Sequence, residues 1–176
     1  MLIGQADWKL TANAQASVGV WGYTATFPYI DPSRPGGQRR GGVYGSVQGP
    51  LPFGDDWSGW IRLGLADPAV DVVDSYFGAG LVKQGPLRGR KDDQLGIAIA
   101  RAGVAGPARR LQDLPEAETS IEATYRLAAT ETFALQPDVQ YIVHPAGAPR
   151  LPNALVFGLR VVLTGQCPRN SADTED

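Results

Sequence analysis

The chain has 176 residues, of which 43% are hydrophobic and only 19% charged, with 22 glycines and 14 prolines. This length fits one domain, and the composition is too apolar for a disordered chain and too rich in Gly and Pro for a helical bundle. The net charge is −2 and the basic residues are scattered, so we expect no nucleic-acid partner. Many strands joined by turns are the expected architecture.

No apolar stretch approaches the roughly 18 residues that a membrane-spanning helix needs, because Arg101 and Arg160 interrupt the two best candidates. Membrane β-strands stay possible, since their alternating faces give a weak hydropathy signal. The N-terminus has no basic segment followed by an apolar core, so no signal peptide is expected within this chain. Cys167 is the only cysteine, which excludes an internal disulfide.

Alternation of apolar and polar residues, interrupted by Gly and Pro, predicts eight strands. They are expected near residues 16–29, 42–48, 58–66, 73–82, 94–102, 118–127, 131–144 and 153–164. The turn-forming residues between them make consecutive strands antiparallel neighbours, as in an up-and-down barrel. The expected alternation of short turns and longer loops fails at two connections, around Asp67 and from Lys83 to Asp93, which suggests a misplaced strand there.

The last three predicted strands each separate an apolar face from a polar face. Ile121, Tyr141 and Phe157 lie on the first, whereas Glu122, Gln140 and Arg160 lie on the second. A soluble barrel or sandwich with an apolar core would alternate in the same way.

Two observations favour a membrane barrel. Several runs reach roughly the 9 to 11 residues that cross a bilayer at a tilt, whereas strands of soluble domains average about 5 to 6. Aromatic residues also lie near the predicted strand ends, where an interfacial girdle would place them: Phe27, Tyr29, Trp57, Phe133 and Tyr141.

Five segments, in their order and spacing, resemble the carbohydrate-selective porin family, also called OprB-type. They are YFGAGLV at 76–82, GPLRGRKDDQLGIAIA at 85–100, ETSIEATYR at 118–126, LQPDVQYIVHPAG at 135–147 and ALVFGLR at 154–160. The last two resemble the final hairpin of that family. The resemblance covers roughly residues 15–164 and implies an all-β, antiparallel up-and-down transmembrane barrel of sixteen strands, of which this chain would supply about eight.

The resemblance implies passive diffusion of mono- or oligosaccharides through an aqueous pore in the outer membrane of a Gram-negative cell. Its partners would be sugars, outer-membrane lipid, and either further copies of the chain or a missing N-terminal half of the barrel. We expect residues 1–14 to be an N-terminal remnant, 15–164 the C-terminal half of the barrel, and 165–176 a disordered polar tail. We also expect a fragment, because the family's N-terminal half, signal peptide and terminal aromatic residue are not found in the sequence.

Polar residues predicted to face the pore are the candidates for contact with sugar. Arginine donors and carboxylate acceptors suit vicinal hydroxyls, and a tryptophan ring can stack on a sugar. The candidates are Trp60, Arg62, Glu122, Arg126, Asp138, Gln140 and Arg160. As an alternative, the charged candidates could pair across adjacent strands and only hold the wall together.

No enzymatic activity, cofactor or metal is expected. His144 is the only histidine, so neither a catalytic triad nor a familiar metal-ligand spacing is available. The GAG run at 78–80 does not fit a dinucleotide fingerprint, and we expect it to let neighbouring side chains pack against a bare strand. The second hypothesis for function is a soluble eight-stranded barrel that binds a small ligand, with the apolar face of residues 155–163 pointing inward.

Overall fold

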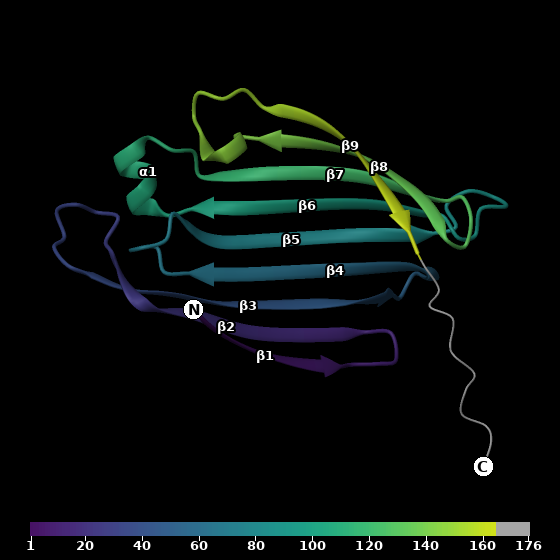
Figure 1. Ribbon diagram of the computed structural model, residues 1–176, viewed down its shortest axis with the longest axis horizontal. Helices are drawn as coiled ribbons and strands as arrows, with labels where there is room; N and C mark the ends of the chain where they lie inside the picture. Colours follow the sequence, from purple (N-terminus) through teal and green to yellow (C-terminus); the bar gives the residue numbers. More distant parts are fainter. Residues whose placement is uncertain (165–176) are drawn as a thin grey trace, which may run out of the picture.

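The computed structural model describes residues 1–164, which form one antiparallel sheet of nine strands (Figure 1). Each strand pairs with the next strand along the chain. The strands are β1 (Leu2–Lys9), β2 (Gln15–Pro28), β3 (Gly37–Leu51), β4 (Gly54–Ala66), β5 (Val73–Gln84), β6 (Gln94–Val104), β7 (Ala117–Ala128), β8 (Phe133–Val143) and β9 (Ala154–Leu163), with helix α1 (Gly106–Gln112) before β7 and the 3₁₀ turn η1 (Pro145–Gly147) before β9. The tail predicted at 165–176 lies outside the described residues.

The eight predicted strands are β2 to β9, so the all-β, up-and-down prediction is confirmed. A ninth strand, β1, was missed; it lies within residues 1–14, which were expected to be an N-terminal remnant. β1 pairs with β2 from Leu2 opposite Gly22 to Lys9 opposite Gln15. Its alternation is faint because two of the positions that share a face with Leu2 and Trp8 are the small residues Gly4 and Ala6.

The connections differ between the two ends of the sheet. At one end, which we call the turn end, strands are joined by residues 10–14, 52–53, 85–93 and 129–132; at the other, the loop end, by 29–36, 67–72, 105–116 and 144–153. The strand order shows that no strand was misplaced around Asp67 or Lys83. The segment 85–93 is long, but it folds back on itself through a bridge between Leu87 and Arg90.

The most deeply buried apolar residues lie at the loop end rather than against the sheet. Val70, Ala105 and Ala108 have no exposed surface. Backbone hydrogen bonds join the loops there: the Ile30 N–H donates to the Ala69 carbonyl and the Ala105 N–H to the Val72 carbonyl, both at 2.9 Å. The loops therefore hold one another in place at the end where α1 lies (Figure 1).

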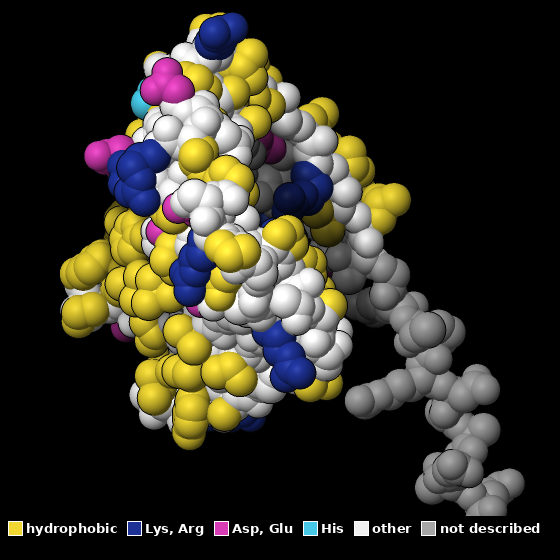
Figure 2. Space-filling model, turned by 90° about the vertical axis from the view of Figure 1, so that its left-hand side faces the viewer, with side chains coloured by type: hydrophobic (Ala, Val, Ile, Leu, Met, Phe, Trp, Pro, Cys, Tyr) yellow, Lys and Arg dark blue, Asp and Glu magenta, His cyan; other side chains and the backbone are white. Residues whose placement is uncertain are grey.

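The sheet is a single curved layer, and the view along the strands shows hydrophobic side chains on its outer rim and basic side chains in the hollow that it partly encloses (Figure 2). β2 to β9 have 10 to 15 residues each, which matches the length expected of membrane-crossing strands. Among the described residues, the helices are all too short to span a bilayer.

The sheet does not close on itself within residues 1–164, because β1 and β9 each pair on one edge only. A soluble ligand-binding barrel would require closure and a buried face on β9. Instead, Phe157 is 76% exposed and Leu159 67% exposed. The structure therefore does not have the architecture of the soluble alternative.

Candidate functional site

One face of the sheet is apolar across all nine strands. The register places Val18, Gly45, Leu63 and Phe77 side by side on β2 to β5. A second row runs from Ile97 on β6 through Ala123 and Val139 to Phe157 on β9. The predicted apolar surface of the last three strands thus extends over the whole sheet, and nothing within residues 1–164 forms a second layer over it.

Aromatic and charged residues mark the borders of this apolar face. Trp8, Trp57 and Phe133 lie at the turn end of β1, β4 and β8, as an interfacial girdle requires. Two charged residues of the same face, Lys83 and Arg101, stand near the ends of β5 and β6, where long side chains can reach water. The middle of the face carries no charge on these two strands.

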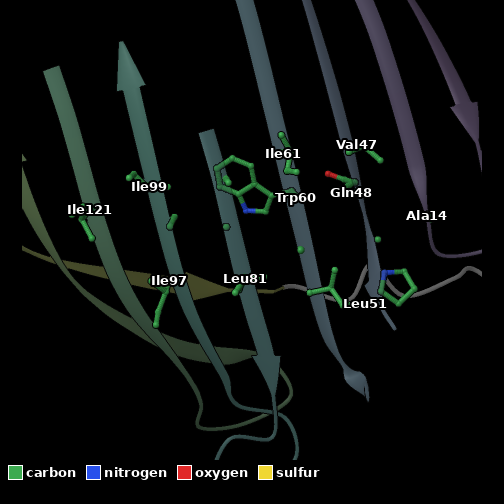
Figure 3. A pocket seen from close by; sticks show the side chains of 16 residues that line it. Ala14, Val47, Gln48, Leu51, Trp60, Ile61, Leu81, Ile97, Ile99 and Ile121 are labelled. Atoms are coloured by element: carbon green, nitrogen blue, oxygen red, sulfur yellow. The ribbon is translucent and has the colours of Figure 1, made fainter. Parts of the chain in front are cut away.

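A groove of about 550 Å³ indents the apolar face (Figure 3). Large side chains surround it, whereas Gly49, Gly59 and Ala79 have little or no side chain to fill the space between them. The labelled residues that line it are mostly aliphatic residues of the apolar face, with Gln48 and Trp60 also in the lining: Ala14, Val47, Gln48, Leu51, Trp60, Ile61, Leu81, Ile97, Ile99 and Ile121. Such a lining lacks the convergent polar groups that orient a sugar, so the groove is not the candidate site.

The seven candidate residues all lie on the opposite, polar face. One cross-strand row contains Trp60 on β4, Gly80, Ala98, Glu122 on β7 and Gln140 on β8. Arg62 lies in the next row beside Ser46 and Gly78. The others have these neighbours: Arg126 lies opposite Gln94, Asp138 opposite Thr124 and Gly158, and Arg160 opposite Gln136.

The charged candidates have neutral neighbours in the register, and none of them forms an ion pair within the described part of the chain. Their contacts are few: the Gln140 amide donates to the Asp138 carboxylate at 3.5 Å, and Arg126 donates to the Asp92 carbonyl at 3.4 Å. The alternative in which these charges pair across strands is therefore not what the structure contains. Their hydrogen-bonding groups remain free to meet a solute.

Trp60 and Tyr76 lie flat against the polar face. A Cβ placed on Gly80 would stand 2.5 Å from Nε1 of Trp60, and one on Gly78 would stand 2.8 Å from Oη of Tyr76 and 3.1 Å from Cζ3 of Trp60. The two glycines are buried beneath the rings. The prediction that GAG provides a bare strand for neighbouring side chains is thus confirmed.

The longest turn is fixed by a buried carboxylate just before β6. Asp93 is 1% exposed, and it accepts hydrogen bonds from Arg90 at 2.8 and 3.1 Å, from the Tyr125 hydroxyl at 2.5 Å and from the Ala128 N–H at 2.9 Å. The hydrogen bond from Arg90, helped by those from Tyr125 and Ala128 and opposed by burial, lowers the pKa of Asp93 to about 2. This cluster ties the segment 85–93 to the β7–β8 turn.

A second carboxylate fixes the loop end. Asp71 lies 3.2 Å from Nε of Arg40, which also donates to the Val70 carbonyl at 3.1 Å. Burial raises the pKa of Asp71, and the positive charge of Arg40 opposes that shift. Both carboxylates hold connections in place and lie away from the polar face of the strands.

Sequence reasoning missed Tyr76 as a companion of Trp60, and it missed Trp21 and Tyr44, which lie over Gly42 and Gly19 on the same face. The signal was present in the alternation. Each of these aromatics occupies a position in phase with polar residues, such as Ser17 with Trp21 on β2 and Ser46 with Tyr44 on β3.

Comparison with known proteins defines the class. The carbohydrate-selective porin, OprB family, matches residues 2–164. Porin B of Pseudomonas aeruginosa is 30% identical over 118 residues, which are 57% of this chain and 26% of Porin B. The high-pH structure of Pseudomonas putida OprB superposes with a TM-score of 0.80 and 23% identity, covering 92% of this chain and 47% of that one.

The chain belongs to the carbohydrate-selective porin family of the OprB type. Its open nine-stranded sheet has the fold of part of an OprB barrel. The chain spans about half the length of the solved OprB chain, at 47%, and its match covers a smaller share of Porin B.

Proposed function

We propose that this chain forms part of the wall of an aqueous pore in a Gram-negative outer membrane, through which carbohydrates pass by diffusion. The observation that carries the proposal is the division of the whole sheet into an apolar face and a polar face with unpaired charges. Hydrocarbon solvates the first, and water and solute occupy the space beside the second. Membership of the carbohydrate-selective porin family supports sugars as the solute.

In this proposal the polar face acts by weak and repeated hydrogen bonding. Arg62, Arg126 and Arg160 donate to sugar hydroxyls, whereas Glu122 and Asp138 accept from them. Such contacts must be weak enough for the solute to leave, which a wet wall with separate donors and acceptors provides. The wall needs no covalent chemistry, so it is the wall of a channel rather than an active site.

The open edges of β1 and β9 require partners in this setting. Backbone groups of an exposed sheet edge are very unfavourable in hydrocarbon, and membrane barrels avoid them by closure. We infer that both edges pair with further strands, so that the pore is wide enough for water. About eight strands alone would enclose a space filled by their own side chains, whereas sixteen leave a channel.

Liposome swelling tests the proposed function. The full-length outer-membrane protein that carries this chain is reconstituted, and vesicles are diluted into isotonic solutions of D-glucose or of a neutral trisaccharide. We expect swelling in glucose at a rate that falls with sugar size. Vesicles that pass small ions but do not swell in any sugar would contradict the proposal.

A further inference from the structure

Trp60 and Tyr76 form a continuous surface, which we call the aromatic platform, over Gly78 and Gly80 of β5. Both rings approach the position that a Gly78 side chain would occupy, so they lie next to each other. Trp60 belongs to β4 and sits opposite Gly80, whereas Tyr76 lies two residues before Gly78 on β5. β5 supplies the bare surface of the two glycines and the ring of Tyr76, and β4 supplies the ring of Trp60.

The glycines determine how the rings lie. Contacts of 2.5 and 2.6 Å between a Gly80 Cβ and the Trp60 indole are shorter than van der Waals packing allows. Any side chain at residue 80 would therefore lift the indole off the sheet and into the space beside the polar face. With glycine there, the indole lies against the wall, and its outward face is shared between that space and the Arg62 guanidinium.

Polar groups surround this platform at distances suited to a small ring. The guanidinium of Arg62 lies over the Trp60 ring, 4.8 Å from its centre, so it covers part of the indole face. Along the row of Trp60, the small residues Gly80 and Ala98 separate the platform from Glu122. With strands about 4.8 Å apart, Glu122 stands roughly 10 Å from β5, which leaves room for one monosaccharide between the platform and the carboxylate.

We propose that the aromatic platform binds the C–H face of ring-form hexoses and that Gly80 is the positioning residue that keeps Trp60 flat for this contact. A pyranose with equatorial hydroxyls has a flat patch of axial C–H groups, which an aromatic face can cover while the hydroxyls point sideways to Arg62 and Glu122. An acyclic polyol has the same hydroxyls but no such patch. This proposal rests on the proposed function and adds a preference for rings over open chains.

The test measures the block of ion current through the full-length protein in planar bilayers by D-glucose and by acyclic D-sorbitol. Trp60→Leu should weaken glucose binding roughly two- to tenfold, the size expected of one aromatic contact, and leave sorbitol binding unchanged. Trp60→Phe keeps an aromatic ring, so it should bind glucose more tightly than Trp60→Leu but less tightly than the unmodified protein. Gly80→Ala should reduce the ratio of glucose to sorbitol affinity with Trp60 still present, because the ring no longer lies flat.

Gly64→Ala is the matched control. Gly64 lies on the same face and on the same strand as Trp60, but its Cβ would meet Tyr76 at 3.5 Å, an ordinary contact. We expect the ratio of glucose to sorbitol affinity in Gly64→Ala to equal that of the unmodified protein. If Gly80→Ala fails to fold, Trp60→Leu and Trp60→Phe still test whether the Trp60 ring causes the preference for glucose over sorbitol.

An unchanged glucose-to-sorbitol ratio in Trp60→Leu, with glucose still blocking the unmodified channel, would overturn the platform and leave the proposed function standing. An unmodified protein whose current responds to neither sugar and whose vesicles do not swell in glucose would instead refute the proposed function.

Discussion

Asp93 shows how one carboxylate organises a connection that the sequence alone made difficult to interpret. The segment 85–93 is too long for a simple hairpin turn, yet Asp93 accepts hydrogen bonds from Arg90 within that segment and from Ala128 beside the next turn. From the sequence alone, the mixed charge of Arg88, Arg90, Lys91, Asp92 and Asp93 predicts a solvated turn, but Asp93 is 1% exposed. Only the pairing of β6 with β7 brings Asp93 to Tyr125 and Ala128, so its burial is a property of the fold rather than of the local sequence.

Asp93→Asn should change how the stability of the barrel depends on pH. The folded-state pKa of Asp93, about 2, lies below the ordinary value of 3.8, so the ionised carboxylate stabilises the fold at neutral pH and that contribution is lost as pH falls from about 4 to about 2. Urea unfolding of the detergent-folded protein at pH 2, 4 and 7 measures this. The Asn variant should be less stable at pH 7 and should lose less stability on acidification.

Asp92→Asn serves as the control, because Asp92 is the exposed neighbour of Asp93. Its pH profile should match that of the unmodified protein. Parallel profiles for all three proteins would contradict this account, because they would show that ionisation of Asp93 does not change the stability between pH 2 and pH 7.

Glu122→Gln should alter the ion selectivity of the pore. The carboxylate of Glu122 forms no ion pair within residues 1–164, so its charge acts on ions in the pore directly. Removing it should lower the ratio of cation to anion permeability, measured as a reversal potential in a salt gradient. Ile121→Gln, one residue away on the apolar face, should leave that ratio unchanged; equal effects at the two positions would place Glu122 outside the pore.

At the scale of elements, the β8–β9 hairpin has the clearest division of faces. Pro137 and Tyr141 lie opposite Leu159 and Leu155 on the apolar face, whereas Gln140 lies opposite Val156 on the polar face. Leu159 is 67% exposed, a value that a soluble protein would not sustain over a whole face.

Lysine substitutions in this hairpin should have opposite consequences. Leu159→Lys places a charge in hydrocarbon and should lower the free energy of unfolding by roughly 2 to 4 kcal/mol if it lies near the middle of the bilayer. Gln140→Lys places the charge in water and should mainly change permeation. Equilibrium unfolding in lipid vesicles measures both, and equal stability losses would contradict the assigned faces.

A strand could be predicted from the sequence where the apolar residues on one of its faces were large. β9 has the large residues Leu155, Phe157 and Leu159 on its apolar face, and it was found; β1 has Gly4 and Ala6 at the corresponding positions, and it was missed. For the candidate site, alternation was sufficient to place all seven candidate side chains on one face. It could not reveal the aromatic platform, because the contact of Trp60 with Gly80 depends on the register of β4 with β5.

At the scale of the whole molecule, the sheet has no core of its own. Its buried apolar residues are few and lie among the loops, whereas large apolar side chains are exposed on every strand from β1 to β9. A hydrophobic surface of this extent is stable only in contact with another apolar phase. The fold therefore implies that an apolar phase contacts the apolar face and that water contacts the polar face.

The central claim is tested most directly by the solvent at two adjacent residues in the middle of β6. Ile97 is 57% exposed on the apolar face, and Ala98 lies on the polar face in the row of Glu122. Ile97→Cys and Ala98→Cys, each made together with Cys167→Ala in the full-length protein, are labelled with an environment-sensitive fluorophore and folded into vesicles. We expect nitroxide lipids to quench the label at residue 97 and aqueous iodide to quench the label at residue 98. The opposite pattern, or iodide quenching at both positions, would show that the apolar face does not meet the membrane.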